Sequence, residues 1–491
     1  MTLPVRPLRL LRGLRETRVD PVAPDAMLLD WLRTSGSHGT REGCAEGDCG
    51  ACTVVLGELD GDRAVLRAVN SCIRPLSSVD GCAVLTVEDL AAPDGALHPV
   101  QQAMVDHHGS QCGFCTPGFV MSLFALYHAE GAPPARVSRE QAQAAISGNL
   151  CRCTGYRPIL DAAQALPAMP VRPFDLDALG AALRGLRDDM GGGEGARFEG
   201  PGGMVWRPAT LAQALACRAE RPEALVVAGA TDVGLWINKQ HRRPAETLDL
   251  GGVAELATVT RDADGLTIGA GVRLTEAFAA LAAEHRSVAG FLERFAGRPV
   301  RNAATLGGNI VNGSPIGDSM PLLIALDARL VLASARGRRE LPLDGFYPGY
   351  RQTLLQPDEL LVAIRVPASA PGLEVHAWKV SKRFEDDISA VCVAIALRGE
   401  AGVVTHARIG VGGMAAVPSR APRAEAELEG APWSLATLQA AADALRGEFT
   451  PLSDMRASAG YRRAVAGNLL LRLWHETQAG SPPLQALEPT P

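Results

Sequence analysis

The stretch GCAEGDCGAC, residues 43–52, places three cysteines within one short run and surrounds them with glycine and alanine. A fourth cysteine, Cys72, follows at a distance. Nine of the eleven cysteines of the 491-residue chain lie in its first 153 residues. Clustered thiols in a large chain of this kind more often bind metal than form disulfides. The cysteine pattern therefore decides how the N-terminal third is interpreted.

The first cysteine group has the spacing C-x4-C-x2-C followed by a distant fourth cysteine, which is typical of plant-type [2Fe–2S] ferredoxins. A loop around an inorganic cluster needs tight turns, and Gly43, Gly47 and Gly50 permit positive φ. Small residues also let backbone N–H groups approach the sulfurs. A structural zinc site is the alternative, although such sites usually pair two C-x2-C units. The predicted ligands are Cys44, Cys49, Cys52 and Cys72.

A second group pairs CGFC at residues 112–115 with CRC at residues 151–153. Both pairs are predicted at helix starts, where the positive end of the helix dipole favours thiolates. Zinc and a redox-active C-x2-C pair are the alternatives, but the redox pair expects a βαβ context and these flanks are helical. The predicted ligands are Cys112, Cys115, Cys151 and Cys153.

Two strings make the second pattern specific, QCGFCTPGF at residues 111–119 and GNLCRCTGYRPI at residues 148–159. In this order, after a plant-type ferredoxin run, they resemble the helical [2Fe–2S] domain of the molybdenum hydroxylases. The resemblance implies two [2Fe–2S] clusters, the second of them beside a molybdopterin held by a partner. It also implies that Gln111 and Cys153 face that pterin.

The chain is predicted to be a multidomain α+β protein. Apolar alternation predicts a β-rich first unit, with Asp25 as the cap of a short helix, and 3.6-residue spacing predicts four helices in the second unit. The predicted domains are a β-grasp ferredoxin-like domain at 1–90, a four-helix [2Fe–2S] domain at 91–168, a linker at 169–200 that includes one helix near 176–190, an α/β FAD-binding domain at 201–372 and a C-terminal α/β flavoprotein domain at 373–480. The last two follow from the resemblance to the molybdenum hydroxylase flavoproteins, which PLSDMRASAGYRR at 451–463 supports.

Glycine-rich turns indicate a nucleotide site in the second half. In residues 226–233 a buried strand ends at Gly229 and a helix follows, which exposes backbone N–H groups to a phosphate. Residues 304–309, followed by 314–318, offer two glycines and polar side chains. Ordinary tight turns would explain either segment. The GAG at 269–271 lacks the third glycine of a dinucleotide fingerprint, so a Rossmann site is rejected.

Together these segments resemble the FAD domain of the same family, in which the first segment holds the pyrophosphate. The resemblance implies these candidate FAD contacts: Val226, Val227, Ala228, Gly229, Ala230, Thr231, Asp232, Val233, Phe295, Thr305, Gly307, Gly308, Asn309, Ser314, Asp318, Leu361 and Lys379. Lys379 could equally be a solvated surface lysine. In SKRFEDDISAV at 381–391, Asp386 matches an acidic residue that affects access of NAD to the flavin, while a solvated acidic turn is the alternative.

The resemblance covers residues 5 to about 475 and points to the xanthine dehydrogenase branch, in the split bacterial form whose molybdopterin domain is a separate large subunit. It implies an oxidoreductase that passes electrons from molybdenum through the helical cluster, the ferredoxin-like cluster and FAD to NAD, in the oxidation of hypoxanthine and xanthine to urate. No residue of this chain is expected to act on the purine. We expect a heterotetramer of two small and two large subunits. The alternatives are the same relay in an aldehyde or N-heterocycle hydroxylase and, from another class, a zinc-stabilised scaffold.

Bulk properties exclude other classes. The net charge of −6 and the pI near 6.0 argue against a general nucleic-acid binder. No segment has about 18 uncharged apolar residues, so no membrane span is expected. The Arg-rich N-terminus lacks the apolar core of a secretory signal. We therefore expect a cytoplasmic protein.

Overall fold

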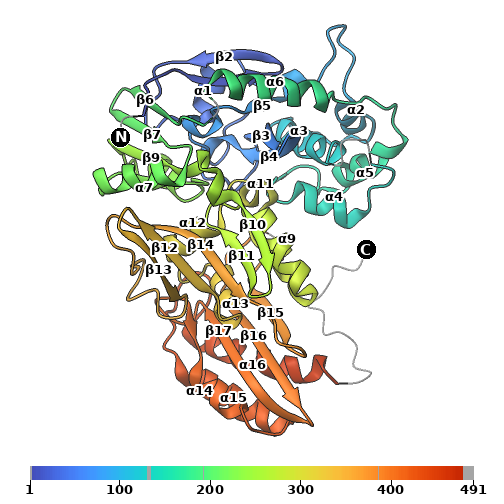
Figure 1. Ribbon diagram of the computed structural model, residues 1–491. Helices are drawn as coiled ribbons and strands as arrows, with labels where there is room; N and C mark the ends of the chain where they lie inside the picture. Colours follow the sequence, from blue (N-terminus) through green and yellow to red (C-terminus); the bar gives the residue numbers. More distant parts are fainter. Residues whose placement is uncertain (1–2, 130–133, 192, 385, 479–491) are drawn as a thin grey trace.

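The computed structural model describes residues 3–129, 134–191, 193–384 and 386–478. In these ranges four sheets, of five, five, four and four strands, form the framework. The cysteine-rich third lies at one end of an elongated body and the C-terminal helices lie at the other (Figure 1). None of the helices in the described ranges has the length and apolar character needed to cross a membrane.

The ferredoxin-like domain is a sheet in the order β2-β1-β5-β3-β4. Its strands are β1 (Leu8–Arg12), β2 (Arg15–Val19), β3 (Thr53–Asp60), β4 (Arg63–Asn70) and β5 (Ala83–Leu85). β1 and β5 are parallel and the other pairs are antiparallel, which confirms the predicted β-grasp arrangement. Helix α1 (Leu28–Thr34) begins after Met27, which makes no side-chain cap bond. The predicted cap at Asp25 is wrong, because its carboxylate pairs with Arg243 at 3.0 Å.

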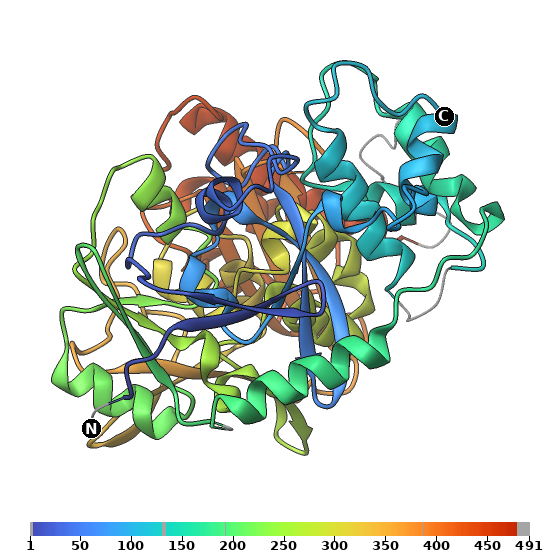
Figure 2. The same cartoon turned by 90° about the horizontal axis from the view of Figure 1, so that it is seen from above.

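The second domain contains the four predicted helices, α2 (Pro99–Asp106), α3 (Thr116–Tyr127), α4 (Arg139–Ile146) and α5 (Arg157–Ala165). Seen from above, they lie to one side of the ferredoxin-like sheet (Figure 2). Ser138 caps α4 by accepting from the N–H of Gln141, whose side chain bonds back to Ser138. Phe119, Phe124 and Tyr127 of α3 are fully buried in the core of this domain.

The segment predicted as a linker contains the helix predicted near 176–190 and is otherwise more structured than expected. Helix α6 (Leu176–Asp189) buries Leu179, Leu183 and Leu186 against residues of the ferredoxin-like sheet. A Cβ at Gly57 of β3 would lie 2.9 Å from Leu179, so the glycine lets the helix approach the strand closely. β6 (Ala196–Gly200) also lies in this segment and pairs with β7 (Gly203–Arg207), so the predicted start of the next domain at residue 201 divides a hairpin.

The central region has two sheets, β6-β7-β9-β8 and β10-β11-β14-β12-β13. The further strands are β8 (Leu225–Val227), β9 (Glu246–Asp249), β10 (Val259–Asp262), β11 (Gly265–Gly269), β12 (Arg329–Ser334), β13 (Gly337–Pro342) and β14 (Leu360–Pro367). The helices are α7 (Leu211–Glu220), α8 (Val233–Asn238), α9 (Leu274–Glu284), α10 (Ala289–Glu293), α11 (Arg298–Arg301), α12 (Leu306–Asn312) and α13 (Ser319–Ala325). β7 and β8 both run parallel to β9, so the turn after β8 lies at the sheet edge where a phosphate-binding segment is expected.

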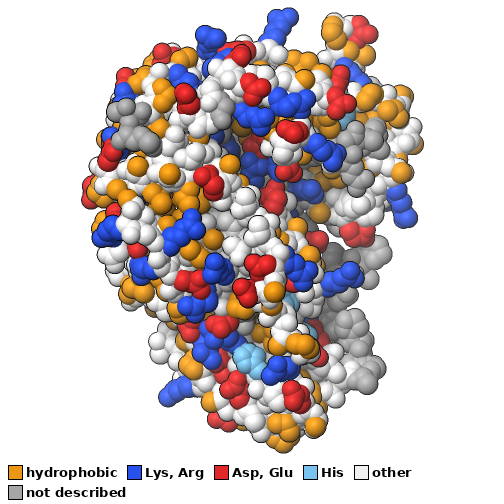
Figure 3. All heavy atoms as spheres, viewed as in Figure 1, with side chains coloured by type: hydrophobic (Ala, Val, Ile, Leu, Met, Phe, Trp, Pro, Cys, Tyr) orange, Lys and Arg blue, Asp and Glu red, His pale blue; other side chains and the backbone are white. Residues whose placement is uncertain are grey.

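The last domain is the antiparallel sheet β15 (Glu374–Val380), β16 (Val391–Glu400), β17 (Val403–Gly412) and β18 (Ser419–Arg420). Helices α14 (Pro422–Leu428), α15 (Leu435–Glu448) and α16 (Ala459–Glu476) supply the apolar side chains that pack with this sheet. Acidic and basic side chains are interspersed over the face drawn in Figure 3. The mixture of these sheets and helices confirms the predicted multidomain α+β fold.

Candidate cluster and cofactor sites

The first cysteine group brings its four sulfurs together from two loops. Cys44, Cys49 and Cys52 lie on the loop before β3, and Cys72 lies on the short helix η1 (Ser71–Ile73). These thiols are free, and the neighbouring Cys49 and Cys72 thiols, which can donate to the sulfur of Cys44, hold the pKa of Cys44 below its ordinary value. The neighbouring Cys72 thiol likewise lowers the pKa of Cys52. Four sulfurs that meet in this way suit a shared inorganic group.

The backbone wraps these sulfurs closely. The N–H groups of Glu46 and Cys49 both donate to Cys44 Sγ with N···S distances of 3.4 Å. Gly47 and Gly50 have positive φ as predicted, but Gly43 does not. Gly43 is needed for space, because a Cβ there would lie 2.8 Å from Cys49 Sγ. The loop thus fits a small cluster whose sulfur ligands accept backbone hydrogen bonds.

The second group is shallower and its thiols meet in pairs. All four thiols are free; burial and the neighbouring Cys151 thiol raise the pKa of Cys115, and the neighbouring Cys112 thiol raises that of Cys153. Cys112 and Cys153 are exposed, as is the neighbouring Gln111. The four cysteines belong to the residues just before α3 and α5, although the residue that directly precedes α5 is Tyr156. No set of three or more His, Cys, Asp or Glu side chains in the described ranges is arranged for a single metal ion.

The two cysteine groups are joined by a direct contact. The N–H of Leu150, which precedes Cys151, donates to the carbonyl of Cys49 at 2.9 Å. The buried side chain of Asn149 donates to the carbonyl of Gly50 at 3.0 Å and to Thr53 Oγ1 at 3.1 Å. Asn149 belongs to the string GNLCRCTGYRPI, but no local pattern in the sequence predicts its contacts with the other loop. The contact places the loop of one group against the loop of the other.

The two glycine segments predicted for the flavin lie against each other. A Cβ at Gly229 would lie 2.2 Å from the carbonyl oxygen of Ala303, so this glycine is needed where the segments meet. Asp232 in the first segment accepts a hydrogen bond from Asn312 at the end of α12, and burial raises the pKa of Asp232. The amides of residues 229–232 donate to no acceptor in the described ranges. Successive free backbone N–H groups in a half-buried turn can form an anion-binding site.

The other candidate FAD residues surround these segments in different ways. Thr305 caps α12 by accepting from Gly308 N–H at 3.0 Å, and Asn309 accepts from Ser319 at 2.5 Å. Leu361 is buried in the core, and Phe295 packs edge-on against Phe278. The remaining candidates in these turns are buried or half-buried, except Gly308, which is exposed: Val226, Val227, Ala228, Ala230, Thr231, Val233, Gly307 and Ser314.

Lys379 and Asp318 form a buried ion pair with an Nζ–Oδ2 distance of 2.9 Å. Their side chains are 3% and 4% exposed, so the interpretation of Lys379 as a solvated lysine is wrong. Ser389 donates to the other Asp318 oxygen at 2.6 Å. Since both carboxylate oxygens already have partners, these residues stabilise the contact between α13 and β15.

Asp386 lies between the C-terminal domain and the ferredoxin-like loop. It has a positive φ of 48° and accepts a hydrogen bond from the N–H of Gly297. One of its oxygens is buried without a partner in the described ranges. Burial, with the nearby Asp48 carboxylate, raises the pKa of Asp386 to about 6. The Asp386 carboxylate is therefore half-buried with one buried oxygen, while Lys382 and Arg383 of the same turn are exposed.

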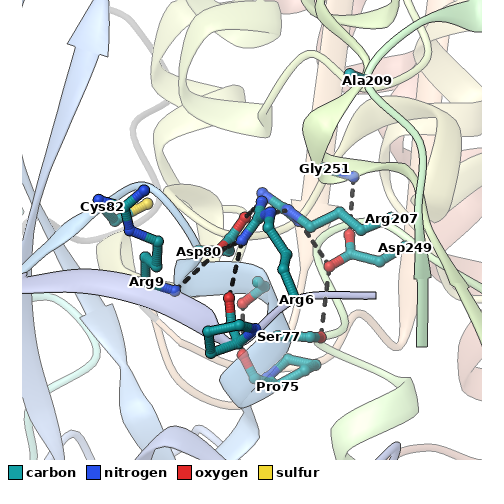
Figure 4. Close-up of polar contacts among 12 residues, drawn as sticks. Arg6, Arg9, Pro75, Ser77, Asp80, Cys82, Arg207, Ala209, Asp249 and Gly251 are labelled. Carbon is teal, nitrogen blue, oxygen red and sulfur yellow. Dashed lines mark hydrogen bonds and ion pairs between the residues drawn. The ribbon is translucent and has the colours of Figure 1, made fainter. Parts of the chain in front are cut away.

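An ionic network joins the ferredoxin-like domain to the central region (Figure 4). Asp80 accepts two hydrogen bonds from the guanidinium of Arg6, at 2.7 and 2.8 Å, and lies 3.9 Å from Arg207. Arg207 pairs with Asp249 at 2.7 Å, and Ser77 donates to the same carboxylate at 3.5 Å. Burial opposes the charge of Arg207, but Asp249 and Asp80 raise its pKa. The network fixes the loop after Cys72 to β7 and β9, and no local sequence signal predicted it.

Family models match almost the whole chain in the predicted order. They are described as a 2Fe-2S iron-sulfur cluster binding domain (residues 14–76), a [2Fe-2S] binding domain (86–164), an FAD binding domain in molybdopterin dehydrogenase (196–369) and a CO dehydrogenase flavoprotein C-terminal domain (376–477). The carbon monoxide dehydrogenase of Hydrogenophaga pseudoflava is 31% identical with a TM-score of 0.52, over 54% of this chain and 93% of that one. The chain belongs to the molybdenum hydroxylase family.

Other members of the molybdenum hydroxylase family are similar over different lengths. Xanthine dehydrogenase of Drosophila pseudoobscura pseudoobscura is 32% identical over 94% of this chain, and that of Emericella nidulans is 34% identical over 93%. The chain spans 38% of the length of each of these relatives. Quinoline 2-oxidoreductase from Pseudomonas putida 86 is 26% identical with a TM-score of 0.51, over 54% of this chain and 93% of that one. The matches support two [2Fe–2S] domains and an FAD domain, in place of a zinc-stabilised scaffold.

Proposed function

We propose that this chain is the electron-transfer subunit of a xanthine dehydrogenase, in which electrons from a partner's molybdenum centre reach NAD through two [2Fe–2S] clusters and FAD. The proposed reaction of the complex is the oxidation of hypoxanthine and xanthine to urate. The hydrogen bond between Leu150 and Cys49 carries the proposal, because it joins the two ligand loops directly. The clusters and the flavin would supply the redox chemistry, and this chain would supply position and environment.

The proposed ligands follow the two cysteine groups. Cys44, Cys49, Cys52 and Cys72 would hold the ferredoxin-like cluster, whose charge the backbone N–H groups at Cys44 would stabilise. Cys112, Cys115, Cys151 and Cys153 would hold the helical cluster. This second site is the open one, since two of its sulfurs are exposed.

The exposed residues of the helical site are an argument that a partner carrying molybdopterin binds there. Gln111, Cys112 and Cys153 would face the pterin and admit electrons there. The partner would be a large subunit, and the complex a cytoplasmic heterotetramer of two copies of each subunit.

The free amides of residues 229–232 would hold the FAD pyrophosphate. Gly229 and Ala230 are buried, so water has little access to their N–H groups. A phosphate oxygen would therefore satisfy donors that otherwise lack an acceptor. Gly229 would act through packing against Ala303, and exposed Gly308 would leave room for the cofactor.

Asp386 would influence NAD at the flavin. Its half-buried carboxylate is close enough to Asp48, in the loop of the ferredoxin-like site, to feel the charge of that side chain. Replacing Asp386 with Asn is expected to change NAD turnover several-fold while reduction of a dye by xanthine changes less, since dyes can accept electrons elsewhere. Equal loss of both activities would indicate a structural role for Asp386.

The deciding experiment assembles the chain with a molybdopterin-containing large subunit and measures substrate-dependent reduction of NAD. Xanthine should be oxidised by the complex, and this chain alone should oxidise NADH with artificial dyes but not xanthine. The solved quinoline and carbon monoxide enzymes favour one second candidate, the same relay in a hydroxylase of another substrate. Turnover of an aldehyde or an N-heterocycle without turnover of xanthine would replace the first proposal by that one.

A further inference from the structure

Helix α8 begins at the proposed flavin segment and ends on the loops of the ferredoxin-like site. Its last residue, Asn238, donates from Nδ2 to the carbonyl oxygen of Cys72 at 2.7 Å and to that of Ala45 at 3.0 Å. These carbonyls belong to the two separate loops that carry the proposed ligands. One side chain from the FAD domain therefore ties both ligand loops together.

The helix also packs directly on one of these loops. A Cβ at Gly234 would lie 2.7 Å from the Cβ of Ile73 and 2.8 Å from its carbonyl oxygen. Ile73 follows Cys72 in η1. Since the glycine leaves no gap between helix and loop, α8 cannot shift without moving Cys72.

The bond to Ala45 reaches a sulfur through one peptide unit. The carbonyl of Ala45 and the N–H of Glu46 belong to the same planar peptide. That N–H donates to Cys44 Sγ at 3.4 Å. Asn238 therefore orients this peptide, whose N–H group donates to a proposed ligand sulfur. It also polarises the peptide, because consecutive hydrogen bonds in a chain strengthen one another.

The first turn of the helix is bound to the flavin segment. The N–H of Gly234 donates to the carbonyl of Ala230 at 2.7 Å, and Ala230 holds a positive φ of 61° among the free amides. With six residues, α8 is about 9 Å long. A change in the backbone at residues 229–232 is thus transmitted through the short, packed helix α8 to the loops of the ferredoxin-like site.

We propose that Asn238 is a positioning residue that couples FAD binding to the ferredoxin-like cluster. FAD at residues 229–232 fixes α8, and Asn238 then holds the Ala45–Glu46 peptide and Cys72 in the arrangement that stabilises the reduced cluster. This inference rests on the proposed function, which puts FAD and the cluster at these positions. Hydrogen bonds toward cluster sulfurs raise reduction potentials, so the coupling has a direct observable. By linkage, reduction of the cluster strengthens FAD binding by the same factor, and such factors typically span about 5- to 150-fold.

The test compares the potentials of both clusters, followed by electron paramagnetic resonance, in FAD-loaded and flavin-depleted full chain. In the wild type, flavin removal should lower the potential of the ferredoxin-like cluster, and the FAD dissociation constant should be about 5-fold or more smaller when that cluster is reduced. Asn238→Asp and the uncharged Asn238→Leu should lower the potential and abolish its dependence on FAD. The helical cluster serves as an internal control. Gln240→Glu is the matched control, because the side chain of this exposed residue of the same segment makes no hydrogen bond or ion pair in the described ranges.

Two results would overturn the coupling. Wild-type protein with equal potentials in the loaded and depleted states would do so without any variant. Asn238 variants that keep iron, flavin and the wild-type dependence would also do so. Both leave the proposed function intact, whereas wild-type protein without iron or flavin would contradict the function and the coupling together.

Discussion

The two cysteine groups differ in what surrounds them. Cys52 and Cys72 of the first group are 1% and 3% exposed, and the group is enclosed by its own loop, by α8 and by the helical domain. Cys112 and Cys153 of the second group reach the surface. A buried site with contacts on two sides suits the middle of a relay, while an open site suits the end that meets a partner. The comparison also predicts that the two sites respond differently to substitution and to acid.

The largest effect is expected from removing a ligand. The chain should bind about four iron atoms, as two [2Fe–2S] clusters require, and Cys52→Ser or Cys153→Ser should each halve that number. Cys52→Ser should also destabilise its domain, because this side chain packs against Leu29 and Ile73 in a small core. Iron analysis and thermal unfolding measure the two effects.

Cys217→Ala is the matched control for the ligand variants. This cysteine is buried in a different core, on α7, and iron should remain unchanged. Full iron in either serine variant would remove that cysteine from the assignment.

The contact between the two sites should be sensitive to Asn149. Its side chain donates to Gly50 and Thr53 and accepts from Ser122 Oγ at 2.6 Å, all within buried surroundings. Asn149→Leu would leave these groups unpaired, and we expect a loss of about 3 kcal/mol of unfolding free energy. Denaturant unfolding measures this loss. A loss below about 0.5 kcal/mol would mean that the two loops do not depend on this bridge.

The ferredoxin-like domain, which holds the first cysteine group, should also lose stability in strong acid through Glu58. Burial alone would raise the pKa of this carboxylate, but Arg273, Arg67 and Arg74 lower it to about 2 from 4.5. A depressed folded pKa gives stability that is complete above about pH 4.5 and is lost as pH falls toward 2. Such a shift corresponds to about 3 kcal/mol. Glu58→Gln should flatten the pH profile in this window, and an unchanged profile would contradict the assignment.

The helical domain should respond to acid at higher pH. Burial lowers the pKa of His98 to about 3 and that of His128 to about 4. These histidines bind protons in the unfolded chain at a higher pH than in the folded chain. Stability is therefore lost as pH falls from about 6.5 toward 4. His128→Phe should reduce this loss, because the ring packs among Phe124, Tyr127 and Phe174. Hydrogen exchange measured separately for the two domains follows this loss of stability. If both domains open at the same pH, the predicted difference between their pH ranges is wrong.

The sequence by itself determined the family, the four-domain order and the candidate ligands. Those features are local, because cluster ligands within a loop impose a spacing and helices carry their own apolar period and caps. The α2–α5 helices were predicted for the same reason. The positive φ of Gly47 and Gly50 could also be predicted, since it is a property of the loop itself.

Only the tertiary structure decided how these parts meet. The bonds of Asn238 to Ala45 and Cys72, the bridge made by Asn149 and the burial of Lys379 all join residues far apart in the chain. A polar side chain has no periodicity that tells a solvated position from a buried one. Its partner is fixed when separately folded domains pack, and packing depends on the shapes and charges of both surfaces. The sequence thus indicates the candidate cluster ligands, and the packing of the domains decides which of their loops lie in contact.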